Sequence, residues 1–168
     1  DEFTAHLELS NLLADHGDFG NAVKALDEVV ANPGCGPQAL ATALVKRGFA
    51  KGKLGDVQGA MADYTAVIEL AGAPKEQVAW AVFFRGVAKR ELGDMRGAMA
   101  DYTVIIELDE ASKEGIAIAL VNRGNAKSRL GDVQGAMADY TAVTELEGAS
   151  TEAIARALVN RGLAKGQL

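Results

Sequence analysis

Apolar side chains recur at helical spacing along most of the chain. In the stretch 95–106 they stand 3, 4, 7, 10 and 11 positions after the first one, which places them on one face of a helix. The same stripe is present in 57–68 and 133–143, and strand signals are absent. The pattern predicts an all-α chain with helices over residues 3–15, 19–30, 37–53, 57–70, 75–91, 95–108, 113–129, 133–146 and 151–167.

The chain is built from near-copies of one segment. Arg-Gly recurs at Arg47, Arg85, Arg123 and Arg161, always 38 residues apart. Leu-Gly-Asp recurs between helices, where the Gly ends one helix and the Asp can cap the next. Self-similarity at such a period is typical of stacked helix pairs. We expect a single array with an atypical first repeat in 1–36, full repeats in 37–73, 74–111 and 112–149, and the first helix of a truncated fifth repeat in 150–168.

The composition excludes several classes of function. The net charge is −6 at pH 7, whereas a nucleic-acid-binding surface needs an excess of clustered Lys and Arg. No apolar run approaches the ~20 residues of a membrane span. The only histidines, His6 and His16, have no metal-ligand spacing, and the glycines do not form a phosphate-binding loop. We therefore expect no enzyme, no metal site and no cofactor.

Cys35 is the only cysteine, so no intramolecular disulfide can form and the redox state of the compartment stays open. No signal peptide is visible, but the chain starts without Met and stops inside a repeat, as expected of a segment of a longer protein. These features leave the compartment open and favour the cytoplasm only slightly.

The repeated residues resemble the tetratricopeptide repeat family. That family has a Gly in the first helix of each pair, a Gly-Asp turn, and an Ala and an aromatic residue in the second helix. Small residues on facing helices let the two backbones approach closely, and the aromatic ring fills the gap beside them. The resemblance covers the whole chain and implies an α-solenoid, a right-handed superhelix of antiparallel helix-turn-helix repeats. The matching positions are Gly48, Gly86, Gly124 and Gly162, then Ala22, Ala60, Ala98 and Ala136, and then Tyr64, Tyr102 and Tyr140.

The chain departs from the family pattern in its period. The usual period is about 34 residues, and the extra residues here fit one added turn at the start of the first helix. A second family of helix-pair repeats, with a similar period and a glycine-rich loop between its helices, is the nearest competitor. That loop is not matched in this sequence.

Charged residues recur at positions where the tetratricopeptide family usually has apolar or aromatic ones. Each recurring Arg except Arg161 is followed sixteen residues later by an Asp, and the first repeat lacks both. Because the Arg and the Asp are absent together from the first repeat, we expect them to form a pair that links the two helices of each full repeat. A guanidinium group can bind a carboxylate through two parallel hydrogen bonds, which suits such a packed interface. The alternative is a ladder of arginines that binds an acidic ligand. The lysines four residues after each Arg are expected to have solvated or snorkelling head groups, with their stems covering apolar surface. The predicted pairs are Arg47–Asp63, Arg85–Asp101 and Arg123–Asp139.

The resemblance also implies a ligand groove, because the first helices of tetratricopeptide repeats line a concave surface. Trp80, Phe83 and Phe84 lie within five residues in the third repeat, and aromatic side chains dominate binding hot spots. We expect binding to centre on Trp80, Phe83 and Asn125; the alternative is that the rings belong to the core. The groove-facing set would be Val45, Phe49, Trp80, Phe83, Val87, Arg90, Val121, Asn125, Val159 and Leu163.

These features indicate a scaffold that binds a protein or peptide in this groove. The alternative is a structural module that self-associates through open solenoid ends, since the apolar side of helix 151–167 has no following helix to cover it. That side carries Ala157, Leu158 and Gly162.

Overall fold

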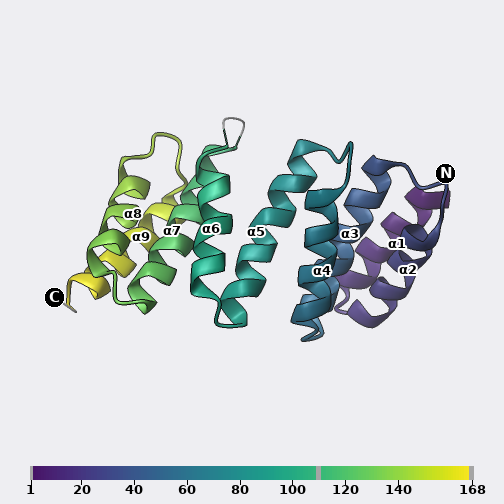
Figure 1. Ribbon diagram of the computed structural model, residues 1–168, viewed down its shortest axis with the longest axis horizontal. Helices are drawn as coiled ribbons and strands as arrows, with labels where there is room; N and C mark the ends of the chain where they lie inside the picture. Colours follow the sequence, from purple (N-terminus) through teal and green to yellow (C-terminus); the bar gives the residue numbers. More distant parts are fainter. Residues whose placement is uncertain (1, 109–110, 167–168) are drawn as a thin grey trace. The chain divides into compact units, whose positions relative to one another are not determined.

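A computed structural model describes residues 2–108 and 111–166 of the chain. This part contains nine α-helices and no strand (Figure 1). The predicted repeat boundaries also include residues 1, 109–110 and 167–168, which lie outside the described residues. The chain divides into two compact units, Asp1–Ala88 (unit 1) and Lys89–Leu168 (unit 2), and the boundary falls within helix α5. Each unit is described by itself.

The helices begin and end within two residues of the predicted positions, where those positions are described. They alternate between the first and the second helix of a repeat. The first helices are α1 (Glu2–Asp15), α3 (Pro37–Lys53), α5 (Lys75–Glu91), α7 (Lys113–Arg129) and α9 (Thr151–Lys165). The second helices are α2 (Phe19–Ala31), α4 (Val57–Glu69), α6 (Met95–Ile106) and α8 (Val133–Glu145).

Every second helix follows the same tight turn. In the turn before α4, Gly55 has a φ of 85°, a left-handed conformation that is costly for a residue with a Cβ atom. The carboxylate of Asp56 then accepts a hydrogen bond from the amide of Gly59 at 2.9 Å and caps α4. The turns before α2, α6 and α8 have the same Gly and the same Asp cap. The local sequence therefore fixes where each second helix begins.

Unit 1 packs consecutive helices against one another, α1 on α2, α2 on α3 and α3 on α4, and α1 also contacts α3 (Figure 1). The core between them consists mainly of small and branched side chains, as the low aromatic content requires. The core includes the cluster of Leu26, Val29 and Ala43 and the cluster of Ala41, Leu44, Ala60, Tyr64, Val67 and Ala81.

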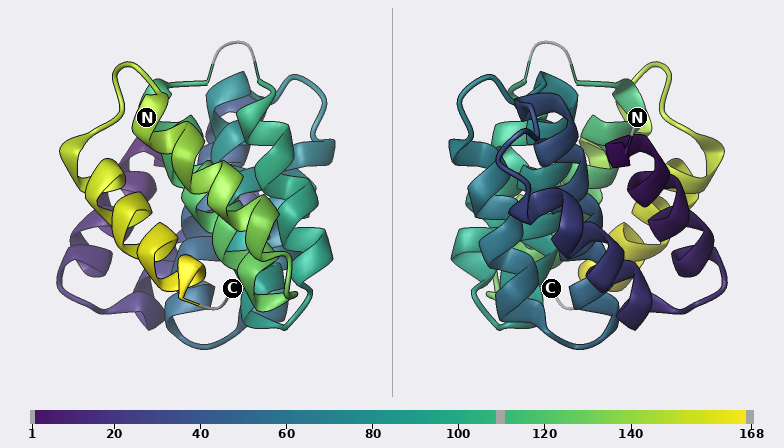
Figure 2. Two further views of the ribbon diagram at one scale, coloured as in Figure 1. Left: turned by 90° about the vertical axis from the view of Figure 1, so that its left-hand side faces the viewer. Right: turned by 90° about the vertical axis from the view of Figure 1, so that its right-hand side faces the viewer.

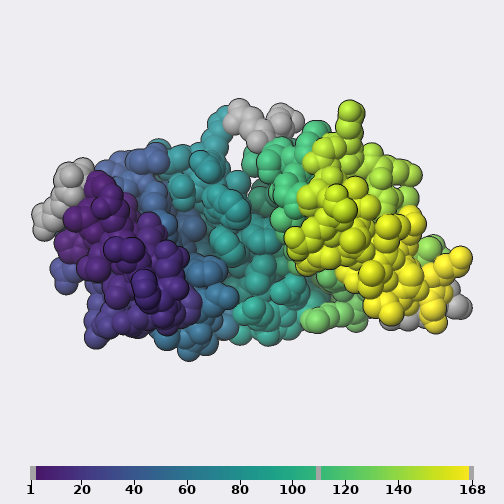
Figure 3. Space-filling view, turned by 180° about the vertical axis from the view of Figure 1, so that it is seen from behind, coloured from purple at the N-terminus to yellow at the C-terminus, as the bar shows by residue number. Residues whose placement is uncertain are grey.

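Unit 2 is built in the same way. Helix α6 packs on α7, α7 on α8 and α8 on α9, and α7 also contacts α9. The left panel of Figure 2 shows α9 (yellow) beside α8, and Figure 3 shows α9 at the surface of the unit. The core of unit 2 includes Ala117, Leu120, Val121, Ala136, Tyr140, Val143, Ala153, Ala157 and Ala164.

Two glycines set the distance between the helices of a repeat. A Cβ atom built on Gly48 would lie 2.7 Å from Cε1 of Tyr64, and one built on Gly124 would lie 2.6 Å from Cε1 of Tyr140. The tyrosine ring of the second helix occupies the space that any larger residue on the first helix would need. The fold is thus an all-α solenoid of helix-turn-helix repeats. The right-handed sense of the predicted superhelix depends on how the two units are joined, and it stays a prediction.

Candidate functional site

An Arg–Asp ion pair joins the two helices of a repeat in each unit. In unit 1, Nε and Nη2 of Arg47 on α3 donate to the two carboxylate oxygens of Asp63 on α4, at 2.9 and 2.6 Å. In unit 2, Arg123 on α7 donates in the same way to Asp139 on α8, at 3.0 and 2.8 Å. Both carboxylates are only 4% exposed, so the bidentate pairs lie inside the helix–helix interface. The third predicted pair, Arg85 with Asp101, joins residues of different units and stays a prediction.

The prediction that the recurring lysines are solvated or snorkelling is wrong for Lys51, Lys89 and Lys127, whereas Lys165 is exposed. Nζ of Lys51 lies 2.9 Å from Oδ2 of Asp63, and Nζ of Lys127 lies 2.9 Å from Oδ2 of Asp139. Lys89 makes the same contact with Asp101 within unit 2. The reason is helical geometry: a residue four positions after the Arg lies on the same helix face. In each of the two complete clusters, one buried carboxylate therefore binds two cations.

The remaining nitrogen of each paired guanidinium contacts the preceding repeat. Nη1 of Arg47 donates to Asp27 on α2 at 2.7 Å, and Nη1 of Arg123 donates to Thr103 on α6 at 3.0 Å. The hydrogen bonds to Asp63 raise the pKa of Arg47 above its ordinary value. Since these two arginines use their donors within the chain, the geometry favours the structural interpretation over a ladder that binds an acidic ligand.

Phe84 on α5 lies at the centre of an aromatic cluster in unit 1. Its ring is stacked with those of Tyr64 and Trp80, each with centroids 5.7 Å apart. It also makes edge contacts with Phe49 at 6.0 Å and Phe83 at 5.5 Å, which are separations typical of favourable ring pairs. Phe49 and Trp80 are 39% and 49% exposed, so one side of the cluster faces solvent.

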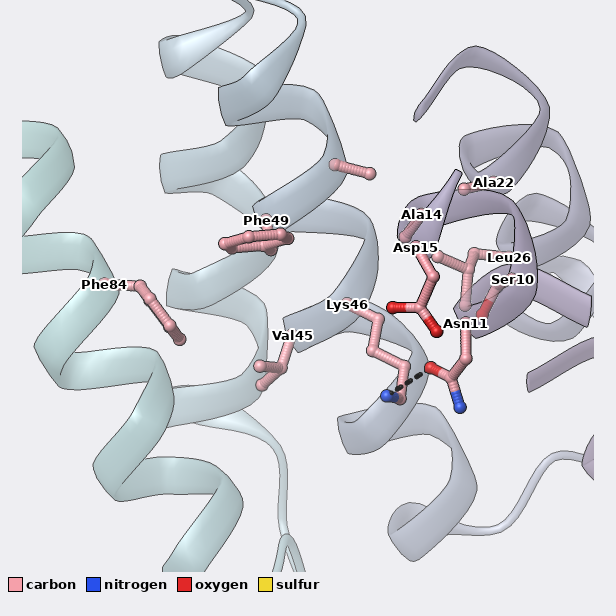
Figure 4. A pocket seen from close by; sticks show the side chains of 11 residues that line it. Ser10, Asn11, Ala14, Asp15, Ala22, Leu26, Val45, Lys46, Phe49 and Phe84 are labelled. Atoms are coloured by element: carbon pink, nitrogen blue, oxygen red, sulfur yellow. Dashed lines mark hydrogen bonds between the residues drawn. The ribbon is translucent and has the colours of Figure 1, made fainter. Parts of the chain in front are cut away.

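A pocket with a volume of about 290 Å³ lies beside this cluster (Figure 4). Phe49 of α3 and Phe84 of α5 supply part of its apolar lining, and Asn11 and Asp15 of α1 supply polar groups. Nζ of Lys46 donates to Oδ1 of Asn11 at 2.7 Å, which links α3 to α1 across the pocket. The volume lies at the lower end of the range for ligand pockets, so it suits a single side chain of a larger ligand.

The predicted groove residues of unit 1 lie on or next to this pocket. Val45 and Phe49 line it directly. Trp80 and Phe83 do not line it, but both rings pack on Phe84, which does. Val87, one turn further along α5, is partly buried. Val45, Phe49, Trp80 and Phe83 are therefore grouped at the aromatic cluster or at the pocket beside it.

Two predicted groove residues of unit 2 are held by hydrogen bonds. Nη1 of Arg90 donates to Oδ1 of Asn122 at 2.9 Å. Oδ1 of Asn125 accepts from Oη of Tyr140 at 2.7 Å and from Nδ2 of Asn160 at 2.9 Å. These polar side chains thus fix neighbouring helices to one another.

The remaining predicted groove residues of unit 2 differ in exposure. Val121 is 1% exposed within the core of unit 2, so it offers no surface to a ligand. It is buried because α7 has both α8 and α9 packed on it. Val159 and Leu163 on α9 are exposed.

Sequence reasoning missed Phe84 and the residues of α1 as parts of the pocket. Phe84 occupies the repeat position that holds Lys46 and Asn122 in neighbouring repeats, so an aromatic residue at a polar position was the available signal. Asn11 and Asp15 were missed because the first repeat differs in sequence from the others. Its residues could therefore not be assigned to a helix face by alignment with the later repeats.

No cluster of three or more His, Cys, Asp or Glu side chains within residues 2–108 and 111–166 could hold a metal ion. The described helices include none with the length and apolar character needed to cross a membrane. Burial raises the pKa of the Cys35 thiol, which lowers its thiolate fraction at neutral pH.

Comparisons with known proteins place the chain among helical repeat proteins. Residues 117–150 match the family model described as tetratricopeptide repeat. The comparison with curated protein sequences found no match. The chain is similar in structure to a tetratricopeptide repeat protein from Parabacteroides merdae ATCC 43184, with a TM-score of 0.74 and 20% identity. That alignment covers 99% of this chain and 61% of the other, so the chain spans less than two thirds of that protein's length.

Two structures named MamA are also similar. The structure of residues 41 to the end of MamA from Desulfovibrio magneticus RS-1 has a TM-score of 0.73 and 16% identity, with 99% of this chain and 90% of that one covered. A second MamA structure has a TM-score of 0.72 and 20% identity, with 98% and 85% covered. Identities this low show a shared fold.

The repeat match supports a protein-interaction scaffold. The described chain has the fold of tetratricopeptide repeat proteins, and its residues 117–150 belong to the tetratricopeptide repeat family.

Proposed function

We propose that the chain is a non-catalytic scaffold that binds a peptide segment of a partner protein in a groove along the first helices of its repeats. The observation that carries the proposal is the pocket of unit 1, where an exposed Phe49 ring and the Phe84 ring adjoin polar groups of α1. A bound peptide places one large apolar side chain against these rings and extends along the helices on either side.

Charge gives the peptide a preferred composition. The chain carries a net charge of −6, which favours approach of a basic segment. Asp15 is exposed on α1 and lines the pocket, so a Lys or Arg beside the apolar anchor gains a partner. An exposed ion pair contributes only about 0–1 kcal/mol. Affinity therefore depends mainly on the apolar anchor, and the basic residue adds selectivity.

Other first-helix residues of each unit belong to the proposed binding surface of that unit. In unit 1 these are Trp80, Phe83 and Val87, and in unit 2 they are Arg90, Asn125, Val159 and Leu163. Val121 is left out of the set because it is buried. Val45 borders the pocket itself and contributes to its apolar wall.

Selection from a random peptide library displayed on phage tests this function. We expect selected peptides to share a large apolar residue with a basic neighbour. The Phe49→Ala variant should bind them about thirtyfold more weakly, the typical loss for an aromatic hot spot. Leu54→Ala is the matched control, because Leu54 is 56% exposed at the end of α3 and does not line the pocket.

Thermal unfolding of both variants separates loss of binding from loss of fold. A Phe49→Ala variant that stays folded at the assay temperature and binds the selected peptides as tightly as the unaltered chain would contradict the proposal. Failure to enrich any peptide would do the same.

The alternative function is self-association through open solenoid ends. Leu158 of α9 favours it, because this apolar side chain is 46% exposed, but Ala157, which was expected on the same open side, is buried at 0%. Sedimentation over a range of concentrations distinguishes the two functions. The scaffold predicts a constant mass, and the alternative predicts a mass that rises with concentration.

A further inference from the structure

Lys53 of α3 places its ammonium group over one of the aromatic rings of the pocket. Nζ of Lys53 lies 5.2 Å from the centroid of the Phe49 ring, within the range at which an ammonium group is attracted to the face of an aromatic ring. The spacing of four residues brings the two side chains onto one face of α3. Phe49 lines the pocket, whereas Lys53 does not. The Phe49 ring is thus shared between the ammonium group and the pocket.

This pairing of a ring with a lysine is particular to the second repeat. In α1 the two equivalent positions hold Asn11 and Asp15, which lie on the side of the pocket opposite the rings of Phe49 and Phe84 (Figure 4). The pocket therefore has a carboxylate on its α1 side and a cation beside its aromatic side. In later first helices the two positions hold Val87 and Glu91, and Asn125 and Arg129.

The rings and Asp15 do not by themselves decide between an apolar and a basic anchor. The aliphatic stem of a Lys or Arg can pack on the rings of Phe49 and Phe84, with its charged head at Asp15. The net charge of −6 also favours the approach of a basic side chain. A further feature of the pocket must therefore set the charge of the side chain that enters it.

Two cations of α3 oppose a basic side chain in the pocket. The ring of Phe49 already interacts with Lys53, and a second cation on this ring would be repelled by the first. Lys46 lines the pocket and donates Nζ to Oδ1 of Asn11 at 2.7 Å. Neither lysine forms an ion pair with a described residue. Their charges therefore act on whatever enters the pocket.

We propose that Lys53 is a specificity-determining residue of the pocket, which excludes a cationic anchor and restricts the pocket to an uncharged side chain. This inference rests on the proposed peptide binding and adds the chemical class of the anchor. The basic residue of the peptide then lies outside the pocket, on the α1 side, where Asp15 is exposed. The peptide therefore carries its apolar and basic groups on separate residues.

Isothermal titration calorimetry with two peptides that differ only at the anchor tests the proposal. A peptide selected from the phage library is synthesised with norleucine or with lysine at the anchor position, because these side chains have similar stems and differ in the ammonium group. The measured quantity is the Kd of the lysine peptide divided by the Kd of the norleucine peptide. Lys53→Gln should lower this ratio at least about threefold, since it frees the ring for the ligand's ammonium group and removes the repulsion.

Lys24→Gln is the matched control. It removes the same charge from an exposed position on α2 that does not line the pocket, where Nζ of Lys24 donates to Asn21 at 3.2 Å. The ratio should not change in this variant. Added salt should reduce the difference between the unaltered chain and Lys53→Gln, because salt screens exposed charges. A role of the Lys53 stem in packing alone would not depend on salt.

The results separate this inference from the proposed function. An unchanged ratio in Lys53→Gln, with the norleucine peptide still bound, would overturn the inference and leave the proposed function intact. An equal fall in Lys24→Gln would also overturn it, because net charge would then set the selectivity. The same holds if the unaltered chain binds both peptides equally well. Absence of binding of the norleucine peptide to the unaltered chain would refute the proposed function and this inference with it.

Discussion

At the scale of single residues, the recurring Arg, Lys and Asp act as one three-residue cluster. A carboxylate as buried as Asp139 is costly without compensating partners, and Arg123 and Lys127 supply them from one face of α7. Each cluster forms across the interface between two helices. The cluster therefore contributes to the pairing of helices.

A double-mutant cycle measures this coupling. Asp139→Ala leaves two cations facing each other in the interface, and Arg123→Ala leaves the carboxylate with the lysine alone. We expect each single change to lower the free energy of unfolding by about 2–4 kcal/mol and the pair to lower it by less than the sum, with a coupling of about 1–3 kcal/mol. Urea unfolding of the four proteins gives these values. Additive losses would contradict the three-residue cluster.

The glycine opposite the tyrosine ring gives a second prediction at this scale. In Gly124→Ala the new methyl group lies 2.6 Å from Cε1 of Tyr140, so the ring or the helix must move. We expect a loss of about 1–3 kcal/mol in unfolding free energy. Gly52→Ala on α3, also a first helix, is the control. Its new Cβ atom would lie 3.9 Å from Cβ of Ala60, an ordinary contact, so the free energy of unfolding should stay the same or rise. Equal stability of the two variants would show that the close approach is not required.

At the scale of helices, local residues determine where elements begin and end. The Gly-Asp turn can be predicted directly from the sequence, because the left-handed Gly and the Asp that caps the next helix interact only with backbone groups a few residues away. The positions of side chains in the groove depend instead on which helices pack on either side. Val121 and Val159 occupy the same repeat position, yet one is buried and the other exposed. The lysines were misplaced because each Asp was assigned to the Arg alone, although a Lys four residues after the Arg lies on the same helix face and also reaches that carboxylate.

The caps predict a graded effect of substitution. Asp132 accepts a hydrogen bond from the amide of Gly135 at 2.9 Å. Asp132→Ala should lower the free energy of unfolding by about 1 kcal/mol, and Asp132→Asn by much less, because Asn also caps helices well. Thermal unfolding monitored by circular dichroism compares the two. An equal loss in both variants would indicate that the charge of Asp132, rather than its capping bond, supports α8.

At the scale of the molecule, the helix pairs and their turns were predictable from the repeat, but the pocket was not. Its walls include residues of the atypical first repeat and Phe84, which replaces a polar residue of the template. A periodic surface offers similar contacts in every repeat, so departures from the template are where selectivity for one peptide can arise. The pocket of unit 1 combines two such departures.

The central claim is that a peptide binds the first helices at this pocket. Two-dimensional NMR of the 17.5 kDa chain, titrated with a peptide selected from the library, tests it most directly. The account predicts that the amide signals of Asn11, Asp15, Lys46 and Phe49 shift most, and that these shifts are lost in Phe49→Ala. Shifts confined to the second helices α2 and α4, with the signals of α1 and α3 unchanged, would contradict it.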